Sequence, residues 1–489
     1  MARNNSLIRT ACPLAEAARQ FPDDTAILHG PLTISFSQLN HLVNAGAAQL
    51  EKSGVSEGQR VVLAQPPEPD TIVILWALWR LGATACLLNT RFPAETLNRQ
   101  ILSLDADAVF VSEHFSLNSA LPDVRQLAWE QFNTLNAPSA APSRTDIDPS
   151  RPATILFTSG SSSAPKAAVH NLAAHLANAA GSLKHIPFRP GDRWLLTLPL
   201  YHVSGLSLLF RSVTGGGGLV IPSLQEDLTR SVERYQITHL SLVSTQLARI
   251  FQNPHNLERI ISLKTILLGG GPAAHELFSE AERWGLPLYI TYGLTETASQ
   301  AATTDRLQRN EAPAARVLEH AQIRIKDDGE ILVKGPALFL GYWQDGKIVS
   351  PLDADGWYAT GDLGTLDQDG KLTVTGRKDF MFVSGGENIQ PEEIEKELVA
   401  MEGIDQAVVV PATDKTFGFR PVAFLKEDGT SALNTTKIQE HLRQILPGFK
   451  VPVFFYRWPK HLRPAALKIP RQIFTNLIQE HPDKLEEYN

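Results

Sequence analysis

The chain has 489 residues, 43% of them hydrophobic and 20% charged, with a formal net charge of −7 and a pI of about 6.1. This composition suits a soluble protein of two to four domains, and its acidic balance argues against a nucleic-acid-binding protein, which needs a basic face. The two cysteines belong to no paired ligand motif, which argues against a disulfide framework and a cysteine-rich zinc site.

No stretch of the sequence predicts a targeting or membrane segment. Residues 1–10 contain two arginines but no long apolar stretch, so no signal peptide is expected. The most apolar early stretch, 71–88, is interrupted by Arg80 and Gly82, which favours a buried helix, a loop and a strand over a membrane span. We therefore expect a cytoplasmic protein with no membrane span. The sequence leaves open whether it forms a homodimer.

The first half of the chain alternates short apolar stretches with amphipathic ones. Strands are predicted at residues 26–29, 60–64, 83–88 and 108–111, and helices at 37–51, 70–81 and 94–102. Such alternation indicates βα units and a parallel sheet. Residues 136–150, rich in Pro, Ala and Ser, indicate a linker or surface loop.

The same alternation restarts at residue 154. Strands are predicted at residues 154–158, 194–198, 219–222, 239–243, 265–268 and 288–291, and helices at 171–183, 204–213, 227–235, 245–252 and 274–284. Two packed α/β halves would place strand ends at a shared crevice, where open α/β sheets usually bind ligands.

From about Val317 the pattern changes to hairpins. Turn residues separate predicted strands at 323–326 and 330–334, and again at 363–366 and 372–375. The tail predicts a helix at 391–401, a strand at 406–410 and a helix at 435–446. These last elements form a small α+β unit that starts near Asp379.

A Ser-rich segment after a predicted strand is the strongest motif: Thr158-Ser159-Gly160-Ser161-Ser162-Ser163-Ala164-Pro165-Lys166. Small side chains let backbone N–H groups and hydroxyls face a phosphate, and the lysine adds charge. It is not a Walker loop, because residues 167–169 predict a strand rather than a helix. The alternative is a flexible surface loop.

Two further motifs end predicted strands. In Pro199-Leu200-Tyr201-His202-Val203-Ser204-Gly205, an aromatic ring and a histidine can line a substrate pocket, although a lone histidine is more often structural. In Leu268-Gly269-Gly270-Gly271-Pro272, the glycines permit close approach by a flat ring, or they form a plain tight turn.

The next motif is Thr291-Tyr292-Gly293-Leu294-Thr295-Glu296-Thr297. Here Tyr292 can stack on a base, Thr295 can bond a phosphate and Glu296 can hold Mg2+. Farther on, Asp362 can accept ribose hydroxyls and Arg377 adds a cation, although a surface turn explains each alone. A Gly-rich segment before a helix completes the set: Ser384-Gly385-Gly386-Glu387-Asn388-Ile389.

In this order the motifs resemble those of the acyl-adenylate-forming superfamily, which includes acyl-CoA synthetases, and they run from the Ser-rich segment to Leu467-Lys468-Ile469-Pro470-Arg471. The resemblance implies a large N-terminal domain, residues 1–378, with two packed α/β subdomains and a small β-barrel-like part. It also implies a mobile small α+β C-terminal domain, residues 379–489. The implied activity is ATP-dependent ligation of an acid to coenzyme A, with Mg2+ and an acyl-adenylate intermediate.

The resemblance also implies a role for each motif. The Ser-rich segment through Lys166 would hold the pyrophosphate, with Thr295 and Glu296 on phosphate and Mg2+. Adenine would contact Gly269–Gly271 and Thr291, Tyr292 and Gly293. The ribose would bind to Asp362 and Arg377. The thiol of coenzyme A would be guided by Ser384, Gly385 and Gly386. Lys468 would bridge the α-phosphate and the acyl oxygen, and His202 would complete the catalytic set. Asp379 would be the hinge.

The motif versions are most similar to those of ligases that act on an aromatic acid carrying a second carboxylate. Arg211 is the candidate partner for that charge, because arginine can clamp a carboxylate with two parallel hydrogen bonds. Ser204 and Ser299 complete the predicted substrate set. The alternative is a solvent-facing Arg211 on a surface helix.

The sequence departs from the family pattern in two places: Ser162-Ser163 replaces Thr-Gly, and Leu467 replaces the glycine before the catalytic lysine. Three other functions stay open. They are a ligase for a fatty or simple aryl acid, an adenylation enzyme that loads a carrier protein, and a nucleotide-binding regulator without turnover. The presence of Lys166, Glu296, Asp362 and Lys468 argues against the regulator.

Overall fold

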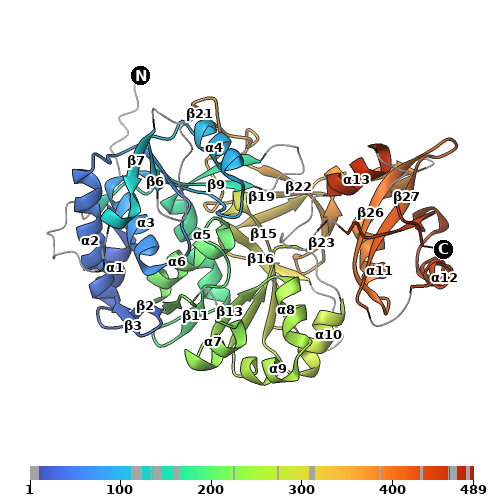
Figure 1. The fold of residues 1–489 in the computed structure, drawn as a ribbon, viewed down its shortest axis with the longest axis horizontal. Coiled ribbons are helices and arrows are strands. Elements are labelled where there is room, and N and C mark those ends of the chain that lie inside the picture. The colour runs from blue at the N-terminus through green and yellow to red at the C-terminus, as the bar shows by residue number, and fades with distance from the viewer. Residues whose placement is uncertain are drawn as a thin grey trace.

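The computed structural model describes residues 10–111, 124–132, 135, 146–158, 165–223, 226–271, 275–307, 314–384, 387–429, 433–460, 462, 471–480 and 485–488. A large body contains the chain up to the end of β23 at Arg377, and a smaller lobe formed by roughly the last hundred residues lies at one end (Figure 1). None of the helices in these ranges combines the length and the apolar character needed to cross a bilayer.

An eight-stranded sheet has parallel strands at its centre and antiparallel ones on one side. In sheet order its strands are β21 (Lys347–Val349), β20 (Gly341–Gln344), β10 (Lys166–Asn171), β9 (Pro152–Thr158), β5 (Thr84–Leu87), β4 (Arg60–Leu63), β6 (Ala108–Val111) and β7 (Arg125–Ala128). The strand after Lys166 that excluded a Walker loop is therefore confirmed as β10.

A second sheet of thirteen strands joins the other α/β half to the predicted hairpins. In sheet order its strands are β18 (Gln322–Ile325), β19 (Glu330–Lys334), β22 (Tyr358–Leu366), β23 (Lys371–Arg377), β17 (Ala315–Val317), β16 (Ser299–Thr303), β15 (Leu288–Leu294), β14 (Thr265–Leu268), β13 (His239–Leu242), β11 (Arg193–Leu195), β12 (Gly218–Val220), β2 (Thr25–His29) and β3 (Leu32–Ser35). The pairing is parallel from β15 to β2 and antiparallel from β15 to β18. The small β part is thus hydrogen-bonded into the second sheet.

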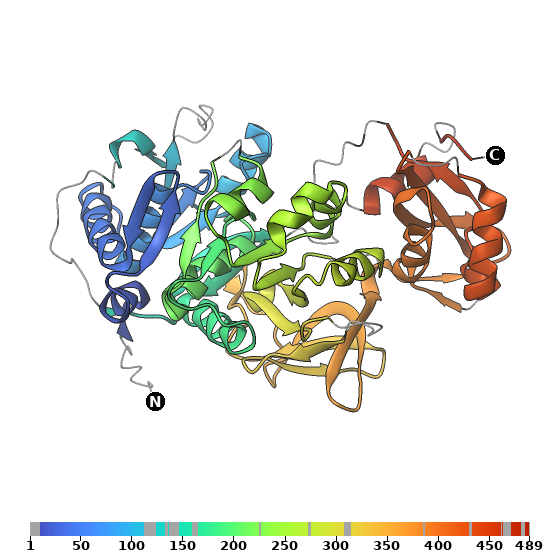
Figure 2. The same ribbon diagram turned by 90° about the horizontal axis from the view of Figure 1, so that it is seen from below.

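Helices cover these sheets, and some lie between them (Figure 2). They are α1 (Pro13–Gln20), α2 (Phe36–Lys52), α3 (Pro69–Leu81), α4 (Ala94–Ser103), α5 (Leu172–His185), α6 (Val203–Gly215), α7 (Leu228–Arg234), α8 (Ser244–Phe251), α9 (Pro254–Ile260) and α10 (His275–Arg283). Helix α3 is apolar on almost every side because it is almost fully buried. One hydrophobic core contains residues of α3, α5 and α6 and of both sheets.

The C-terminal lobe has its own hydrophobic core. Its elements are β24 (Phe382–Ser384), β25 (Glu387–Ile389), α11 (Pro391–Val399), β26 (Ile404–Asp414), β27 (Gly418–Glu427), α12 (Thr435–Ile445), β28 (Phe455–Arg457) and α13 (Arg471–Glu480). The side-chain amide of Gln390 donates a hydrogen bond to the Arg377 carbonyl, 3.1 Å away. A Cβ at Gly376 would lie 2.2 Å from the same amide nitrogen, so the lobe touches the end of β23 closely.

The predicted mixed α/β fold is confirmed, and the predicted helices that carry the site agree with the structure within two residues at each end. Strand ends differ more. Strand β15 continues to Leu294, although the sequence predicted its end at residue 291, because it gains the antiparallel partner β16. The segment after Ser384 was interpreted as a loop, but β24 and β25 pair as a hairpin. Both pairings join neighbouring segments, but whether such segments pair depends on the packing around them, which local patterns do not report.

Buried histidines make the stability of the large body depend on pH. His175 stacks on Phe210 at 4.5 Å, and its Nε2 lies 2.7 Å from the Thr154 hydroxyl. Burial lowers the pKa of His175 well below its usual value, and it lowers that of His239 to about 4. Between pH 6.5 and 4 the unfolded chain therefore binds protons that the folded chain does not. Lowering the pH through this window should remove stability.

We expect each of these two histidines to reduce the free energy of unfolding by about 2 kcal/mol between pH 7 and pH 5. Denaturant unfolding at both pH values measures the difference. The control is His175→Phe, which can still stack on Phe210 but cannot take up a proton. This variant should show a pH-dependent loss smaller by about 2 kcal/mol. The same loss in parent and variant would contradict the assignment.

Candidate active site

Glu296 lies in a short turn, η3 (Thr295–Thr297), that follows β15. Its carboxylate is largely buried and accepts a hydrogen bond of 2.7 Å from the Tyr342 hydroxyl, which lies 3.0 Å from the hydroxyl of Tyr358. Burial and the nearby carboxylate both raise the pKa of Tyr342, so its phenol stays protonated and donates. The Lys166 ammonium lies 5.3 Å from the centre of the Tyr342 ring. The structure thus places Lys166 and Glu296 around one tyrosine.

Asp362 and Arg377 face each other across β22 and β23. The Arg377 guanidinium donates to one Asp362 oxygen at 2.6 Å, and the Tyr292 hydroxyl donates to the other at 2.9 Å. Burial and the Asp362 charge raise the pKa of Tyr292, which keeps it a donor. A carboxylate oxygen can accept more than one hydrogen bond, which is the chemistry that ribose hydroxyls would use. A second guanidinium nitrogen of Arg377 donates to the exposed Asp379, at 3.2 Å.

The predicted adenine-binding residues also stabilise the local fold, through close packing at the glycines and a hydrogen bond from Thr291. A Cβ at Gly269 would lie 2.8 Å from the Thr291 methyl group, and one at Gly293 would lie 1.7 Å from the Ser299 carbonyl oxygen. Gly270 and Gly271 have φ values of 88° and 159°. The Thr291 hydroxyl donates to the Ala302 carbonyl at 3.2 Å. Close backbone packing therefore requires glycine at 293, and the Thr291 side chain favours it at 269, independently of any ligand.

Arg211 is buried on α6, with 1% of its surface exposed, which rules out the solvent-facing alternative. Its guanidinium donates to the Gln300 side-chain oxygen at 2.9 Å and lies 3.5 Å from the Ser299 hydroxyl. The ring of Trp194 lies 5.2 Å from its charge centre. Burial lowers the pKa of Arg211 to about 9, so it remains a cation at neutral pH. Among the described residues no carboxylate forms an ion pair with it.

Two other residues that were predicted to act at the acid substrate, His202 and Ser204, lie at the start of the same helix. His202 caps the N-terminus of α6, and Ser204 lies two turns before Arg211, on the same side. Burial, with a smaller effect from Arg91, lowers the pKa of His202. His202 is therefore neutral at pH 7 and can carry either tautomer. Arg211 and Ser299 thus lie together, whereas Ser204 and His202 lie toward the N-terminal end of the same helix.

Several predicted residues cannot be placed. Ser159, Gly160, Ser161, Ser162, Ser163, Gly385, Gly386 and Lys468 lie outside the described residues. Their neighbours are described: Thr158 ends β9, opposite Lys166, and the buried Ser384 ends β24. Arg471, three residues after Lys468, begins α13 and pairs with Glu395.

Glu296 is a suitable magnesium ligand in a site where the nucleotide supplies the other oxygens. Mg2+ is usually held by one or two carboxylates together with substrate phosphates. In the described part of the chain no three His, Cys, Asp or Glu side chains gather as a metal site, and this mode of binding needs no such group. Tyr342 and Gln300, which contact Glu296 and Arg211, were not predicted from the sequence, because neither belongs to a recognisable motif.

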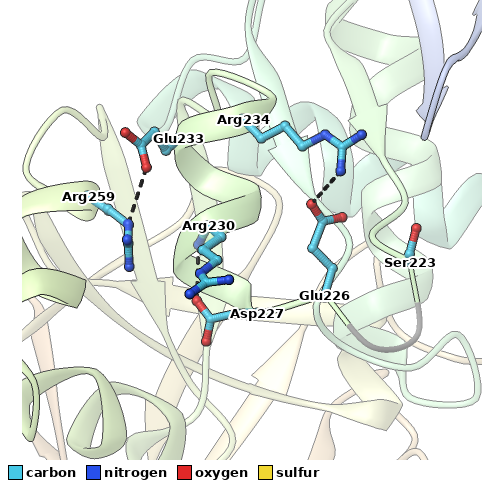
Figure 3. A pocket seen from close by; sticks show the side chains of 7 residues that line it. All are labelled: Ser223, Glu226, Asp227, Arg230, Glu233, Arg234 and Arg259. Atoms are coloured by element: carbon cyan, nitrogen blue, oxygen red, sulfur yellow. Dashed lines mark hydrogen bonds and ion pairs between the residues drawn. The ribbon is translucent and has the colours of Figure 1, made fainter.

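A surface hollow of about 620 Å³ lies beside α7 and α9, where arginines and acids alternate (Figure 3). Arg234 pairs with Glu226 and Arg259 with Glu233, each at 3.2 Å. It is lined by Ser223, Glu226, Asp227, Arg230, Glu233, Arg234 and Arg259. None of the predicted site residues lines this hollow, so it plays no part in the candidate active site.

Comparison with known proteins agrees with this geometry. Residues 14–343 match the AMP-binding enzyme family and residues 393–462 its C-terminal domain. The 2-succinylbenzoate–CoA ligase of Salmonella typhimurium is 34% identical over 451 residues, covering 92% of this chain and 93% of the relative. That of Bacillus licheniformis is 33% identical over 479 residues, covering 94% and 98%.

Solved structures agree as well. The o-succinylbenzoate CoA synthetase (MenE) of Bacillus subtilis, in complex with the acyl-adenylate intermediate OSB-AMP, has a TM-score of 0.86 and 28% identity, covering 96% of this chain and 98% of that one. Wild-type E. coli MenE with a bound analogue of OSB-AMS has a TM-score of 0.80 and 31% identity, covering 96% and 99%. The family match spans more than half of the chain, and the sequence and structural relatives cover nearly all of it. The chain therefore belongs to the AMP-binding enzyme family.

Proposed function

We propose that this protein is an ATP-dependent 2-succinylbenzoate–CoA ligase of menaquinone synthesis. It would convert 2-succinylbenzoate, ATP and coenzyme A into 2-succinylbenzoyl-CoA, AMP and diphosphate through an acyl-adenylate. The observation that carries the choice of substrate is Arg211, a buried cation whose described partners, Ser299 and Gln300, are neutral. A buried charge without an ionic partner is costly, and the second carboxylate of the acid would neutralise it.

Adenylation needs positioning and charge neutralisation, because a carboxylate attacks an anionic phosphate. Lys166 and the Ser-rich segment would hold the leaving pyrophosphate. Glu296, fixed by Tyr342, would hold Mg2+, which neutralises phosphate charge when bound. Asp362 and Arg377 would orient the ribose. Lys468 would neutralise the charge that builds between the α-phosphate and the acyl oxygen.

Transfer to the thiol would follow a movement of the C-terminal lobe. We place the boundary between residues 378 and 379, with Asp379 as the hinge. Asp379 lies at the junction, in η4 (Lys378–Phe380), and its contact with Arg377 links it to the ribose residues. Rotation about this point would replace Lys468 by the face that carries Ser384, which would guide the thiol. We also expect the enzyme to be cytoplasmic. A homodimer is one arrangement that agrees with the sequence.

An acid panel tests the proposal. The purified protein, ATP, Mg2+ and coenzyme A are incubated with 2-succinylbenzoate, benzoate or a medium-chain fatty acid, and AMP and thioester are measured together. We expect equal amounts of AMP and thioester, with 2-succinylbenzoate preferred. Preference for benzoate or the fatty acid would favour the other ligases. AMP without thioester would favour an enzyme that loads a carrier protein, and no AMP with any acid would favour the regulator.

A further inference from the structure

Two consecutive residues after Glu296 have a backbone conformation that is unusual outside glycine. Ala298 has a φ of 54° and Ser299 a φ of 127°. In the described ranges the other non-glycine residues with positive φ are Asp105, Gln236 and Asp345, and each stands alone. Such conformations are unfavourable for residues with a side chain and persist only where neighbouring structure holds them.

Contacts within the turn account for part of this restraint. The Thr297 hydroxyl accepts from the Leu294 N–H at 2.9 Å and lies 2.9 Å from the Ser299 carbonyl oxygen. The absence of a side chain at Gly293 leaves room for that carbonyl. These contacts all come from residues 293–299 and do not fix the turn to the rest of the protein.

Asn178 on α5 is one of the residues that make this connection, beside His170, whose Nε2 lies 2.7 Å from the Thr295 carbonyl, and the Phe339 N–H, which donates to the Glu296 carbonyl at 2.9 Å. The Asn178 side chain is fully buried, and its amide nitrogen donates to the carbonyls of Thr297 at 3.0 Å and Gln300 at 2.8 Å. These two carbonyls flank the strained pair on either side. An amide nitrogen carries two protons, so the two bonds use its full donor capacity and define the orientation of the group.

His320 restrains the same turn from beside Asn178, whose amide nitrogen lies 3.3 Å from its Nε2. Its Nε2 lies 2.7 Å from the Gln300 carbonyl, which can only accept, so Nε2 carries the proton. Burial lowers the pKa of His320, which keeps the ring neutral. A Cβ at Gly181 would lie 1.9 Å from His320 Nδ1, so α5 approaches this ring without any intervening side chain. The Gln300 carbonyl is thus held by Asn178 and His320 together.

The restrained turn carries the groups that meet Arg211. The Ser299 hydroxyl and the Gln300 side-chain oxygen, at 3.5 and 2.9 Å, are the described polar partners of the buried guanidinium. We propose that Asn178 is a positioning residue for acid specificity, because it holds the strained 297–300 turn that orients Arg211 toward a second carboxylate. The proposal rests on the proposed function. It goes further by naming a residue that contacts neither the acid nor Arg211.

The test replaces Asn178 by aspartate, which keeps its shape but turns a donor into an acceptor facing two carbonyls. We expect KM for 2-succinylbenzoate to rise about 10-fold or more in Asn178→Asp, while KM for ATP stays within about 2-fold. The matched control is Asn171→Asp on the same helix. Asn171 caps α5 by accepting from the Ala174 N–H at 2.8 Å, and aspartate caps as well as asparagine, so this variant should behave like the parent.

Two monocarboxylates separate positioning from general loosening. They are 4-oxo-4-phenylbutanoate and 2-butanoylbenzoate, each lacking one carboxylate of 2-succinylbenzoate. The ratio of kcat/KM for 2-succinylbenzoate to that for the better monocarboxylate should fall about 10-fold in Asn178→Asp. An equal loss on both acids would mean a purely structural role and overturn the proposal. If Asn178→Asp does not fold, Asn178→Ser retains one donor and should lower the ratio by a smaller factor.

The acid preference of the parent protein tests the proposed function separately from the role of Asn178. If the parent does not prefer 2-succinylbenzoate to the monocarboxylates, both the proposed function and the role of Asn178 are overturned. If the parent has this preference and Asn178→Asp retains it in full, only the role of Asn178 is overturned.

Discussion

Replacing Lys468 by alanine is expected to reduce acid-dependent release of diphosphate by roughly 10²–10³-fold or more, the usual loss when a group that stabilises transition-state charge is removed. Lysine suits this role as a compact charge on a flexible stem. The assignment rests on the Leu467–Arg471 motif. The rate is measured from the amounts of diphosphate and AMP in reactions stopped at successive times. Thioester formation from a supplied acyl-adenylate should keep most of its rate, because that step does not need the ammonium.

Lys460 and Lys450 provide the controls for this variant. Lys460 pairs with Glu486 at 3.0 Å, and Lys450 forms a pair with Glu393 at 2.5 Å, so both ammonium groups have partners within the C-terminal lobe. Lys460→Ala should release diphosphate at close to the parental rate. A parental rate in Lys468→Ala, or a loss of the same size in Lys460→Ala, would mean that the catalytic lysine has been misassigned.

Removing the charge of Arg211 should affect a dicarboxylate far more than a monocarboxylate. For Arg211→Met we expect kcat/KM for 2-succinylbenzoate to fall about 10²-fold, because a buried charge-assisted pair is lost. The better monocarboxylate should change by less than about 3-fold, since it leaves the arginine unpaired in the parent as well. Steady-state kinetics with both acids measure the difference. Equal losses would remove Arg211 from the acid pocket.

Arg211→Lys and thermal unfolding help to interpret that result. Lysine keeps the charge but not the planar fork, so an intermediate loss is expected. Methionine replaces a buried cation by an apolar chain of similar length, which often leaves stability unchanged or higher. A large drop in Tm for Arg211→Met would instead indicate that the bond to Gln300 stabilises the fold itself.

Elements defined by local pattern were predictable from the sequence. Helix α3 was predicted at 70–81 and runs from Pro69 to Leu81, because Pro69 starts it and Gly82, with a φ of 78°, ends it. Strand β14 matches its predicted range, 265–268. In these cases the residues that define the element lie inside it or next to it.

Contacts that depend on strand register were not predictable. Asp362 was predicted to accept ribose hydroxyls, and the resemblance added Arg377, but the pairing of these two residues depends on the register of β22 and β23, which contains a bulge. Tyr342 reaches Glu296 because β20 pairs with β10, where Tyr342 lies opposite Ala168, 174 residues earlier in the sequence. The two hydrogen bonds that Asn178 donates to the turn depend on how α5 packs against β16. Each of these contacts joins segments whose local patterns are independent of one another.

The contact between Gln390 and the end of β23 has a consequence for the balance between the two half-reactions. The hydrogen at Gly376 lets a carboxamide from the C-terminal lobe lie directly on the main chain, and the bond it makes contributes on the order of 1 kcal/mol. A methyl group at 376 would occupy that space and displace the Gln390 side chain, so this bond would be lost. In the proposed mechanism the C-terminal lobe moves between the two half-reactions, so the bond would favour the orientation that the structure shows, and Gly376→Ala would weaken that preference.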